Sequence, residues 1–416
     1  MHLEIADATQ KLYVCPGESV PISYSVHLGR LAQCYPACET CPLNCETGAT
    51  PMPSTERLRK KHERQLSEVQ FGFGQIRGVY LNRIDRRVTC DIVGQFAAEL
   101  WTNVRRAVQT HRRERIADWT APTVVIGYDQ RNSSPDIMTG LQDRLRLMGC
   151  DVIDLGLTLG PALQYAIRLH KADAGIFVTG SGRLPSWTGF DFFDKHSAPL
   201  SIDNLVVPTI GAPQLKHARP LRSSGKHTFK PISEAYARRL SRFVRRTSEM
   251  RICVGVEDRV AVEHVRRVFE SMGDRLNIVN LPKRPRNLTD IDDPDVRRVG
   301  EAVIQSNSDL GFVIDEDLRN CLVIDELGEA ALPNAIAPAL DKEPQFVDDA
   351  MWHELSARHP ESTVVCGKSV YVFPKKAIQC DASVTLACLV KAFGQMDMTV
   401  SEFVDQHTDT PLRRAA

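Results

Sequence analysis

A pattern that occurs twice in the chain constrains its fold most. Residues 123–131 (TVVIGYDQR) have the same order of apolar, glycine and polar positions as residues 251–259 (RICVGVEDR). Residues 172–181 (ADAGIFVTGS) correspond in the same way to residues 308–317 (SDLGFVIDED). An internal repeat of this kind indicates duplicated structural units. Each copy contains a short apolar run that ends in a polar segment, so the sequence predicts two units in which buried strands lead into loops.

The segments between the repeated strands have the pattern of helices joined by short loops. Strand–helix–strand units of this kind form parallel sheets with right-handed crossovers. Polar loops around Arg131, Gly160 and Ser181 would then meet at the carboxyl edge of one sheet, where open α/β folds bind ligands. The sequence therefore predicts one site that is built from several strand-end loops.

The Gly-Ser-Gly loop of the first unit is the first candidate for chemistry. Gly180 and Gly182 flank Ser181, and glycine permits backbone angles that other residues resist. Such a loop can hold a phosphate group or carry Ser181 as a phosphoryl acceptor, although this tripeptide is also typical of an ordinary turn. A second glycine-punctuated loop is expected at 71–78. It includes Arg77, whose guanidinium is expected to be available to a phosphate or a carboxylate.

The corresponding loop of the second unit carries acids in place of the serine. Asp315 and Asp317 share one side of an extended chain, and carboxylate oxygens are the ligands that Mg²⁺ prefers. Arg319 is the next residue on that side, and its fixed positive charge would repel a divalent ion or pair with the acids. The pattern therefore favours a salt-bridged loop over a tight magnesium site.

Five of the twelve cysteines lie within the first 45 residues. Four of them are spaced closely enough to converge on one ion, and in a reducing compartment such clustering indicates zinc rather than disulfides. These four are Cys34, Cys38, Cys41 and Cys45, with Cys15 or His27 as alternates. The spacing also matches radical iron–sulfur enzymes, and free structural thiols are the remaining alternative. A closed tetrahedral zinc site would be structural, because it leaves no position for a substrate.

Length and charge exclude several classes of function. A chain of 416 residues is long for one core, so two or three domains plus a terminal extension are expected. Lys plus Arg equals Asp plus Glu at 52 each, which argues against a general binder of nucleic acids or anionic membranes. No apolar run approaches the roughly 20 residues that span a bilayer, and the N-terminus does not resemble a secretory signal. We therefore expect a cytoplasmic protein with its other cysteines as reduced core thiols.

The order of these loops resembles the alpha-D-phosphohexomutases, the phosphoglucomutase and phosphomannomutase superfamily, over residues 67–405. Residues 71–78 (FGFGQIRG) resemble the family's opening FGTSGIRG, and residues 127–135 (GYDQRNSSP) resemble its GRDxRxSSP. The loop at 179–189 lies where the family has TASHNP, and the loop at 315–320 lies where it has DGDADR. The resemblance therefore covers most of the chain.

What the resemblance implies is intramolecular phosphoryl transfer on a hexose phosphate, an isomerase reaction of carbohydrate metabolism. Ser181 would be the phosphoserine. Asp315 and Asp317 would hold magnesium. Arg77 and Arg131 would steady the active-site loops and the phosphate, since this chemistry depends mainly on positioning and charge stabilisation.

Several of the family's groups are replaced in this chain. The proton-handling histidine after the serine is absent, and the third metal aspartate and the arginine that follows it are Arg319 and Asn320. Residues 366–371 stand for the sugar-binding motif but lack its acid. Arg183 and Lys368 are the expected substrate-binding residues. These replacements keep a second function open, a catalytically degenerate pseudoenzyme that binds a sugar phosphate or serves as a protein-interaction scaffold.

The expected fold class is α/β, with tandem phosphohexomutase-like three-layer domains, mixed and mostly parallel sheets, and a small N-terminal cysteine-rich zinc-binding module. The expected boundaries are 1–50 for this module, 51–66 for a linker, 67–222 for domain I, 223–325 for domain II, 326–405 for a shortened domain III and 406–416 for a tail. The family's fourth domain is expected to be absent. A phosphosugar is the expected small-molecule partner, and the cysteine-rich module is the expected contact for a protein partner.

Overall fold

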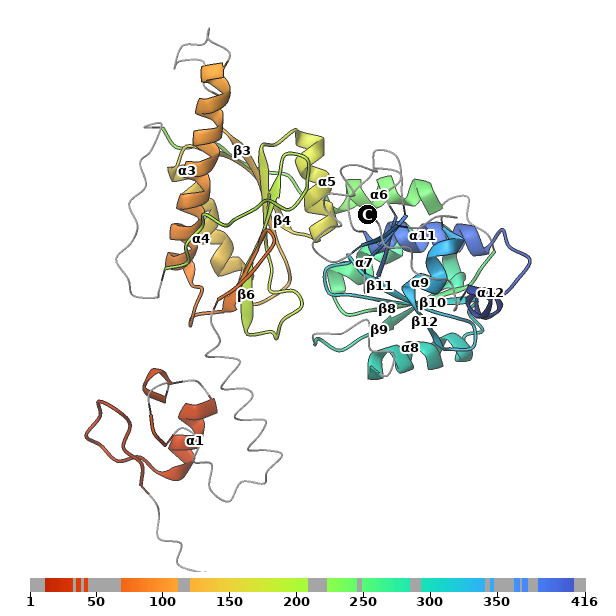
Figure 1. Cartoon of the computed structure of the whole chain (residues 1–416), viewed down its shortest axis with the longest axis horizontal. Helices are drawn as coiled ribbons and strands as arrows, with labels where there is room; N and C mark the ends of the chain where they lie inside the picture. The colour runs from red at the N-terminus through yellow and green to blue at the C-terminus, as the bar shows by residue number, and fades with distance from the viewer. Residues whose placement is uncertain are drawn as a thin grey trace, which may run out of the picture.

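The computed structural model shows two α/β units, a small N-terminal module and a C-terminal group of helices and strands (Figure 1). The residues that the structure describes are 12–32, 35–38, 41–43, 69–110, 120–208, 223–244, 249–284, 293–340, 345–347, 363–366, 369–372 and 381–407. Within these ranges, no helix combines the length and the apolar composition that crossing a bilayer requires.

A seven-stranded mixed sheet forms the centre of the first unit. Its strands are β1 Gln70–Gly72, β2 Gln75–Val79, β3 Thr123–Tyr128, β4 Asp151–Leu157, β5 Ala174–Val178, β6 Trp187–Asp194 and β7 His227–Phe229. They lie in the order β1-β2-β6-β5-β3-β4-β7. Strands β5, β3, β4 and β7 are parallel to one another. The pairs β1–β2, β2–β6 and β6–β5 are antiparallel. The mixed sheet predicted from the sequence is therefore confirmed.

Helices cover both faces of this sheet. Val124 and Ile126 of β3 join the apolar cluster on one face, whereas Val125 joins the cluster on the other, as the alternation of side chains along a strand requires. Strands that are apolar on both faces need helices on both sides to be buried. Those helices are α3 (Arg86–Thr110) and α4 (Ser134–Leu147) on the first face and α5 (Gly160–His170) on the second, where α5 lies toward the second unit (Figure 1).

The second unit repeats the central part of the first. Its strands are β8 Ile252–Val256, β9 Leu276–Asn280, β10 Leu310–Ile314, β11 Cys321–Ile324 and β12 Ala330–Ala331, in the order β12-β11-β10-β8-β9. The segment β11-β10-β8-β9 has the same order and strand directions as β6-β5-β3-β4. The duplication predicted from the sequence is therefore confirmed.

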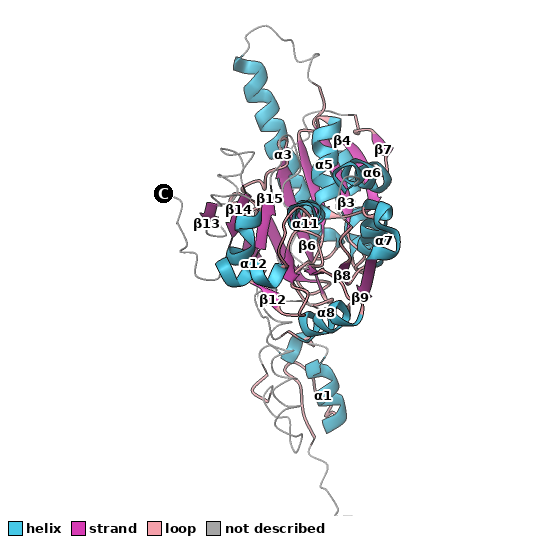
Figure 2. Ribbon diagram, turned by 90° about the vertical axis from the view of Figure 1, so that its right-hand side faces the viewer, coloured by secondary structure: helices cyan, strands magenta, loops and turns pink. Residues whose placement is uncertain are grey.

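Helices also cover both faces of the second sheet. α8 (Pro294–Gln305) packs on one face, and the side chains of the other face join a cluster that includes α6 (Ser233–Val244) and α7 (Arg259–Val268). Figure 2 shows α7 and α8 on opposite sides of β8 and β9. The same cluster contains α5 of the first unit, so the two units share a continuous apolar contact.

The C-terminal group packs against the second unit. It comprises α9 Pro333–Ile336, β13 Gln345–Val347, β14 Thr363–Cys366, β15 Ser369–Val372, α11 Ala382–Phe393 and α12 Val400–His407. The buried Asp381 caps α11 by accepting from the backbone N–H of Ser383, and it also accepts from the hydroxyl of Tyr236 on α6. The backbone N–H of Ala382 donates to the carbonyl of Leu318 at 2.9 Å. α11 therefore begins directly against the loop that follows β10.

The structure corrects one sequence interpretation in this part of the chain. Residues 71–78 form the β1–β2 hairpin rather than an open loop, and Arg77 lies in β2 opposite Gly189 of β6. A Cβ atom on Gly189 would lie 1.9 Å from the carbonyl oxygen of Ile76, so this pairing requires glycine. The sequence did not reveal the pairing of β2 with β6, because these two strands lie more than a hundred residues apart in the chain.

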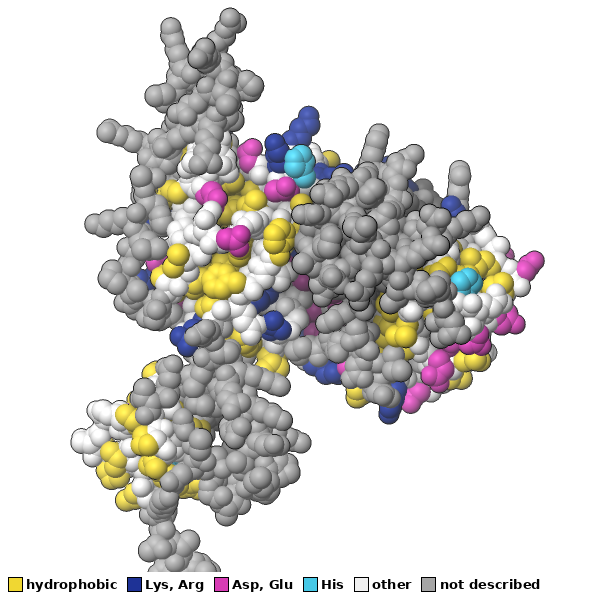
Figure 3. All heavy atoms as spheres, viewed as in Figure 1, with side chains coloured by type: hydrophobic (Ala, Val, Ile, Leu, Met, Phe, Trp, Pro, Cys, Tyr) yellow, Lys and Arg dark blue, Asp and Glu magenta, His cyan; other side chains and the backbone are white. Residues whose placement is uncertain are grey.

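On the described part of the face drawn in Figure 3, basic side chains are dispersed, whereas acidic ones gather along one edge. Within the described part of that face, lysines and arginines occur in small separated groups, and acidic side chains line the outer edge of the second unit. A continuous basic surface, which is the usual footprint of nucleic-acid binding, is not seen on the described part of this face.

Candidate functional site

Three strand-end loops meet where the two units face each other. They follow β3, β5 and β10 and contain residues 129–133, 179–186 and 315–320. The structure thus brings Arg131 and Ser181 of the first unit close to the acidic loop of the second. Gly160 also borders this region, because a Cβ atom there would lie 3.1 Å from the guanidinium of Arg319.

The Ser181 loop is a tight turn that depends on its glycines. The backbone N–H of half-buried Ser181 donates to the hydroxyl of Thr179 at 3.0 Å. Gly182 has a φ of 71°, in the left-handed region that favours glycine. A Cβ atom on Gly180 would lie 2.3 Å from the carbonyl oxygen of Trp187, so only glycine fits there. The two glycines therefore let the loop turn sharply at the end of β5.

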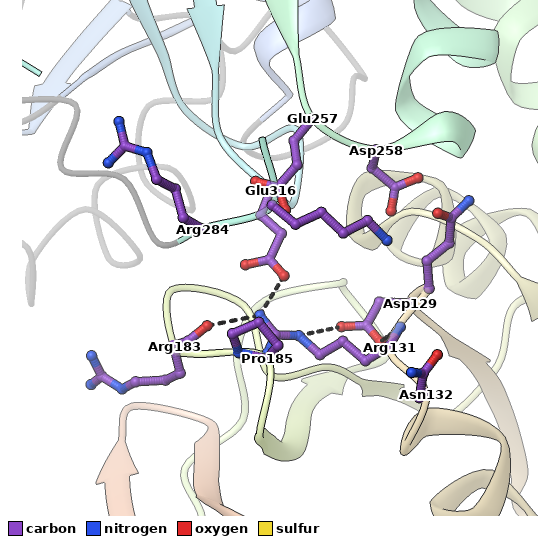
Figure 4. Close-up of a pocket in the computed structure, with 11 residues that line it drawn as sticks. Asp129, Arg131, Asn132, Arg183, Pro185, Glu257, Asp258, Arg284 and Glu316 are labelled. Atoms are coloured by element: carbon purple, nitrogen blue, oxygen red, sulfur yellow. Dashed lines mark hydrogen bonds and ion pairs between the residues drawn. The ribbon is translucent and has the colours of Figure 1, made fainter. Parts of the chain in front are cut away.

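Arg131 holds this loop in place from the neighbouring strand end. Its Nη1 donates to the carbonyl of Leu184 at 2.7 Å and to that of Trp187 at 3.3 Å, and its Nη2 donates to the carbonyl of Arg183 at 3.0 Å. Its Nε lies 3.3 Å from a carboxylate oxygen of Asp129. Figure 4 shows the guanidinium with dashed lines to Asp129, Arg183 and Glu316. Arg131 therefore acts as a rigid clamp on the Ser181 loop, a role that suits the fixed donor geometry of arginine.

Glu316 of the second unit contacts both Arg131 and the Ser181 loop. Its carboxylate pairs with Nη2 of Arg131 and accepts from the backbone N–H of Gly182 at 3.3 Å. Its side chain is 20% exposed and that of Arg131 is 9% exposed. One carboxylate thus ties the acidic loop of the second unit to the Ser181 loop of the first.

A buried ionic network lies next to these loops. Asp191 of β6 accepts from Arg77 at 2.5 Å and from Arg319 at 2.6 Å, and its side chain is only 2% exposed. Burial alone would raise the pKa of Asp191, but the two guanidinium groups together lower it below its usual range. Arg77 also donates to the carbonyl of Phe190 at 2.9 Å, and it is not among the residues that line the cavity described below. The structure therefore places Arg77 in the interior of the first unit.

The acidic side chains of the 315–320 loop are already occupied. Asp315 accepts from the side chain of Asn320 at 2.5 Å and from the backbone N–H of Arg319 at 2.8 Å. Asp317 accepts from the hydroxyl of Thr179 at 3.5 Å and lies 3.9 Å from Nε of Arg319, and the nearby Ser181 side chain lowers its pKa against the larger effect of burial. No group of three His, Cys, Asp or Glu side chains among the described residues could hold a metal ion. Asp315 and Asp317 therefore have protein partners at the position where the family resemblance implies magnesium.

Burial changes the titration of all three acids in this loop. It raises the pKa of Asp315 to about 6 and that of Glu316 to about 7, in the second case against the opposing effect of Arg131. It also raises the pKa of Asp317, although Arg319 counteracts the effect. Desolvation thus outweighs the hydrogen bonds and arginine contacts that favour the charged forms of these carboxylates.

The loops enclose a cavity of about 130 Å³ between the two units. Its lining mixes both signs of charge and consists of Asp129, Gln130, Arg131, Asn132, Arg183, Pro185, Glu257, Asp258, Lys283, Arg284 and Glu316 (Figure 4). The sequence identified Arg131 and Arg183 as candidates but not Lys283, Arg284, Glu257 or Glu316. The repeat contained a signal for one of these, because Glu257 stands in the second unit where Asp129 stands in the first.

The N-terminal cysteines are only partly described. Cys34 and Cys45 lie outside the described residues, as does Lys368. Cys38 and Cys41 follow α1 (Tyr24–Ala32) in the chain and are 2% and 6% exposed. Burial and the neighbouring Cys15 and Cys41 raise the pKa of the Cys38 thiol.

The two alternate ligands of this module have other contacts. Cys15 accepts from Arg30 at 3.0 Å, and the ring of His27 stacks on Tyr13 with 4.1 Å between the ring centres. Both side chains are buried, at 4% and 2% exposure. Neither is placed with two further described ligands in a group that could hold a metal ion.

Comparison with known proteins gives the same family as the motifs. Residues 70–206 match the family model described as phosphoglucomutase/phosphomannomutase, alpha/beta/alpha domain I. The phosphoglucosamine mutase of Clostridium acetobutylicum is 24% identical over 269 residues, and that of Thermoanaerobacter pseudethanolicus is 26% identical over 281 residues. Each match covers 62% of this chain and 56% of the relative. The chain thus spans little more than half the length of these curated relatives.

Solved structures extend the likeness over more of the chain. A phosphoglucomutase/phosphomannomutase family protein from Burkholderia thailandensis has a TM-score of 0.61 at 17% identity, covering 80% of this chain and 78% of its own. The phosphoglucomutase parafusin from Paramecium has a TM-score of 0.51 at 12% identity, covering 83% and 78%. At such identities the likeness shows the fold alone. Motifs, domain model and fold agree: residues 70–206 match domain I of the phosphoglucomutase/phosphomannomutase family, and the chain as a whole resembles the alpha-D-phosphohexomutase superfamily.

Proposed function

We propose that the cleft between the 179–186 and 315–320 loops binds a phosphorylated hexose without a bound magnesium ion. The position of Arg319 carries this proposal. Its guanidinium lies 2.6 Å from Asp191 and 3.9 Å from Asp317, so a fixed positive charge already stands beside the carboxylate that a metal ion would need. A divalent ion at the same place would be repelled by that charge.

The lining of the cavity supports an amino sugar phosphate as the ligand. Exposed cationic side chains there, Arg183 and Lys283, suit a phosphate group, and the carboxylates of Glu257 and Asp258 suit an ammonium group. The curated relatives are named phosphoglucosamine mutases, which are enzymes of an amino sugar. Glucosamine 6-phosphate is therefore the first ligand to test.

Phosphoryl transfer through Ser181 is the second candidate function. The Ser181 side chain lowers the pKa of Asp317 against the larger effect of burial, so the two groups are neighbours, and a carboxylate beside a serine hydroxyl can accept its proton when the oxygen attacks phosphorus. Transfer of this kind would place the phosphoryl group on Ser181 Oγ and break its bond to a sugar oxygen. Binding without transfer is the better-supported proposal. Transfer in this family would use a metal ion at Asp317, and the positive charge of Arg319 lies beside that carboxylate.

Calorimetric titration with glucosamine 6-phosphate tests these proposals. We expect the same dissociation constant in EDTA and in excess Mg²⁺, within about twofold, because no divalent ion takes part in binding. Incubation with glucosamine 1-phosphate, magnesium and a sugar bisphosphate should give neither product nor a mass increase at Ser181. Conversion that depends on magnesium and is lost in Ser181→Ala would instead establish the transfer reaction.

We also propose that the N-terminal module holds one structural zinc ion in a cytoplasmic, reducing environment. Cys38 and Cys41 are both buried, and the backbone N–H of Cys41 approaches the carbonyl of Cys38 at 3.4 Å. A module this small has little apolar core, which is the usual circumstance for a structural metal. Cys34 and Cys45 would complete the tetrahedral set, and a partner protein would contact this module.

Elemental analysis of the purified protein tests the zinc site. We expect about one zinc per chain, and a loss of that zinc in Cys38→Ser, because each thiolate of a closed site is required. Cys90→Ser is the matched control, since Cys90 is a half-buried cysteine on α3 and should leave the zinc content unchanged. A zinc-free wild-type protein would rule the site out.

A further inference from the structure

Glu316 is bound in the way that proteins bind a phosphate oxygen. Its carboxylate is held by the guanidinium of Arg131 and by the backbone N–H of Gly182, next to Ser181. A guanidinium together with the backbone amide of a glycine turn is a common combination in anion sites. The groups that hold Glu316 therefore form an anion site, and this structure fills it with a side chain of the protein itself.

The neighbouring acids do not share this arrangement. Asp315 turns toward Asn320 within its own loop, and Asp317 toward Thr179 and Ser181. Glu316 alone of the three pairs with Arg131, which is 185 residues away along the chain. The contact is thus specific to one side chain and does not follow from the general acidity of the loop.

We propose that Arg131 and the Gly182 amide form a phosphate site which Glu316 closes, and that a phosphate group enters by displacing the Glu316 carboxylate. The identity of the ligand as a sugar phosphate rests on the proposed function, whereas the anion site itself does not. Displacement breaks the bridge between the units, because Arg131 and the Gly182 amide both belong to the first unit and the incoming phosphate would contact these two groups in place of Glu316. Glu316 is therefore an internal competitor that lowers the apparent affinity of the cleft for anions.

Removal of this competitor gives a direct test with inorganic phosphate as the probe. We expect Glu316→Ala to bind phosphate at least about tenfold more tightly than the wild-type protein, because the charged hydrogen bonds of Arg131 become available to it. Glu257→Ala is the matched control. It removes a carboxylate from the same cavity and so reports the general effect of lowering negative charge. Equal affinities of the Glu316→Ala and Glu257→Ala proteins would overturn the proposal.

Further variants separate the anion site from a purely structural bridge. Glu316→Gln keeps an oxygen for the Gly182 amide but loses the charge, and it should also bind phosphate more tightly than the wild-type protein. Adding Arg131→Lys to Glu316→Ala should remove most of the gain, since lysine lacks the paired donors of arginine. A gain that persists in this double variant would contradict the site. Circular dichroism of each variant confirms that it is folded.

The same titrations distinguish this inference from the proposed function. Tight binding of inorganic phosphate by Glu316→Ala, without binding of glucosamine 6-phosphate by any variant, would support the anion site and reject the amino sugar ligand. Absence of any gain for phosphate in both Glu316→Ala and Glu316→Gln would reject the anion site, whatever the sugar phosphate does.

Discussion

Replacement of Arg131 by alanine is expected to lower the free energy of unfolding by about 3–5 kcal/mol, among the largest losses in the chain. The side chain is 9% exposed, and it satisfies three backbone carbonyls of the Ser181 loop as well as the carboxylate of Glu316. Alanine would leave these acceptors without their donor in a partly buried place, which costs more than the net value of each hydrogen bond. Urea unfolding followed by circular dichroism measures the loss.

The internal repeat supplies a matched control for this substitution. Arg259 stands in the second unit where Arg131 stands in the first, but its side chain is exposed. Arg259→Ala should therefore change the free energy of unfolding by no more than about 0.5 kcal/mol. Similar losses for the two variants would mean that the clamp on the Ser181 loop contributes little.

The second large effect is expected at Arg77. Arg77→Met removes one of the two guanidinium groups that neutralise Asp191, whose side chain is 2% exposed. Breaking a buried pair from one side leaves a charge that cannot be solvated, and we expect a loss of about 3–5 kcal/mol in the free energy of unfolding. Chemical unfolding of the purified variant measures this loss.

Two comparisons show whether the buried charge of Asp191 causes the loss of stability in Arg77→Met. Adding Asp191→Asn to Arg77→Met removes the orphaned charge, so the double variant should be more stable than Arg77→Met alone. Arg86→Met breaks a surface pair with Asp136, in which the side chains are 55% and 29% exposed, and should cost no more than about 1 kcal/mol. If Arg77→Met were no worse than Arg86→Met, the network around Asp191 would not be a major source of stability.

The elements that the sequence predicts well are those whose signal lies within one segment. The strands at 123–128 and 174–178 are apolar on both faces, and the intervening segments have helical spacing, so their type follows from a local pattern. The duplication adds a second copy of the same signal, which is why the strands of the second unit could also be predicted.

The parts of the site that were missed depend on partners far away in the chain. Asp191 lies among the apolar residues of β6, and an acid in such a strand is itself a signal of a buried partner. Its partner Arg319 is 128 residues away, so the sequence showed only the nearby Asp315 and Asp317 as neighbours of that arginine. In the same way, the sequence shows Glu316 as one acid of the 315–320 loop, but its pairing with Arg131, 185 residues away, leaves no local pattern.

Strand β7 has a consequence for the way the first unit is completed during synthesis. It pairs with β4 as the last strand of the first sheet, yet it follows the expected domain boundary at residue 222. Gly225 lies so close to Cys150 that a Cβ atom there would meet its carbonyl oxygen at 1.8 Å, and Lys230 donates its backbone N–H to Asp154 at 2.7 Å. The chain must therefore emerge from the ribosome through about residue 230 before β7 can pair with β4 and complete the first sheet. A fragment that ends at residue 222 would expose β4 to pairing with other chains, whereas one that ends after residue 230 would keep that edge covered.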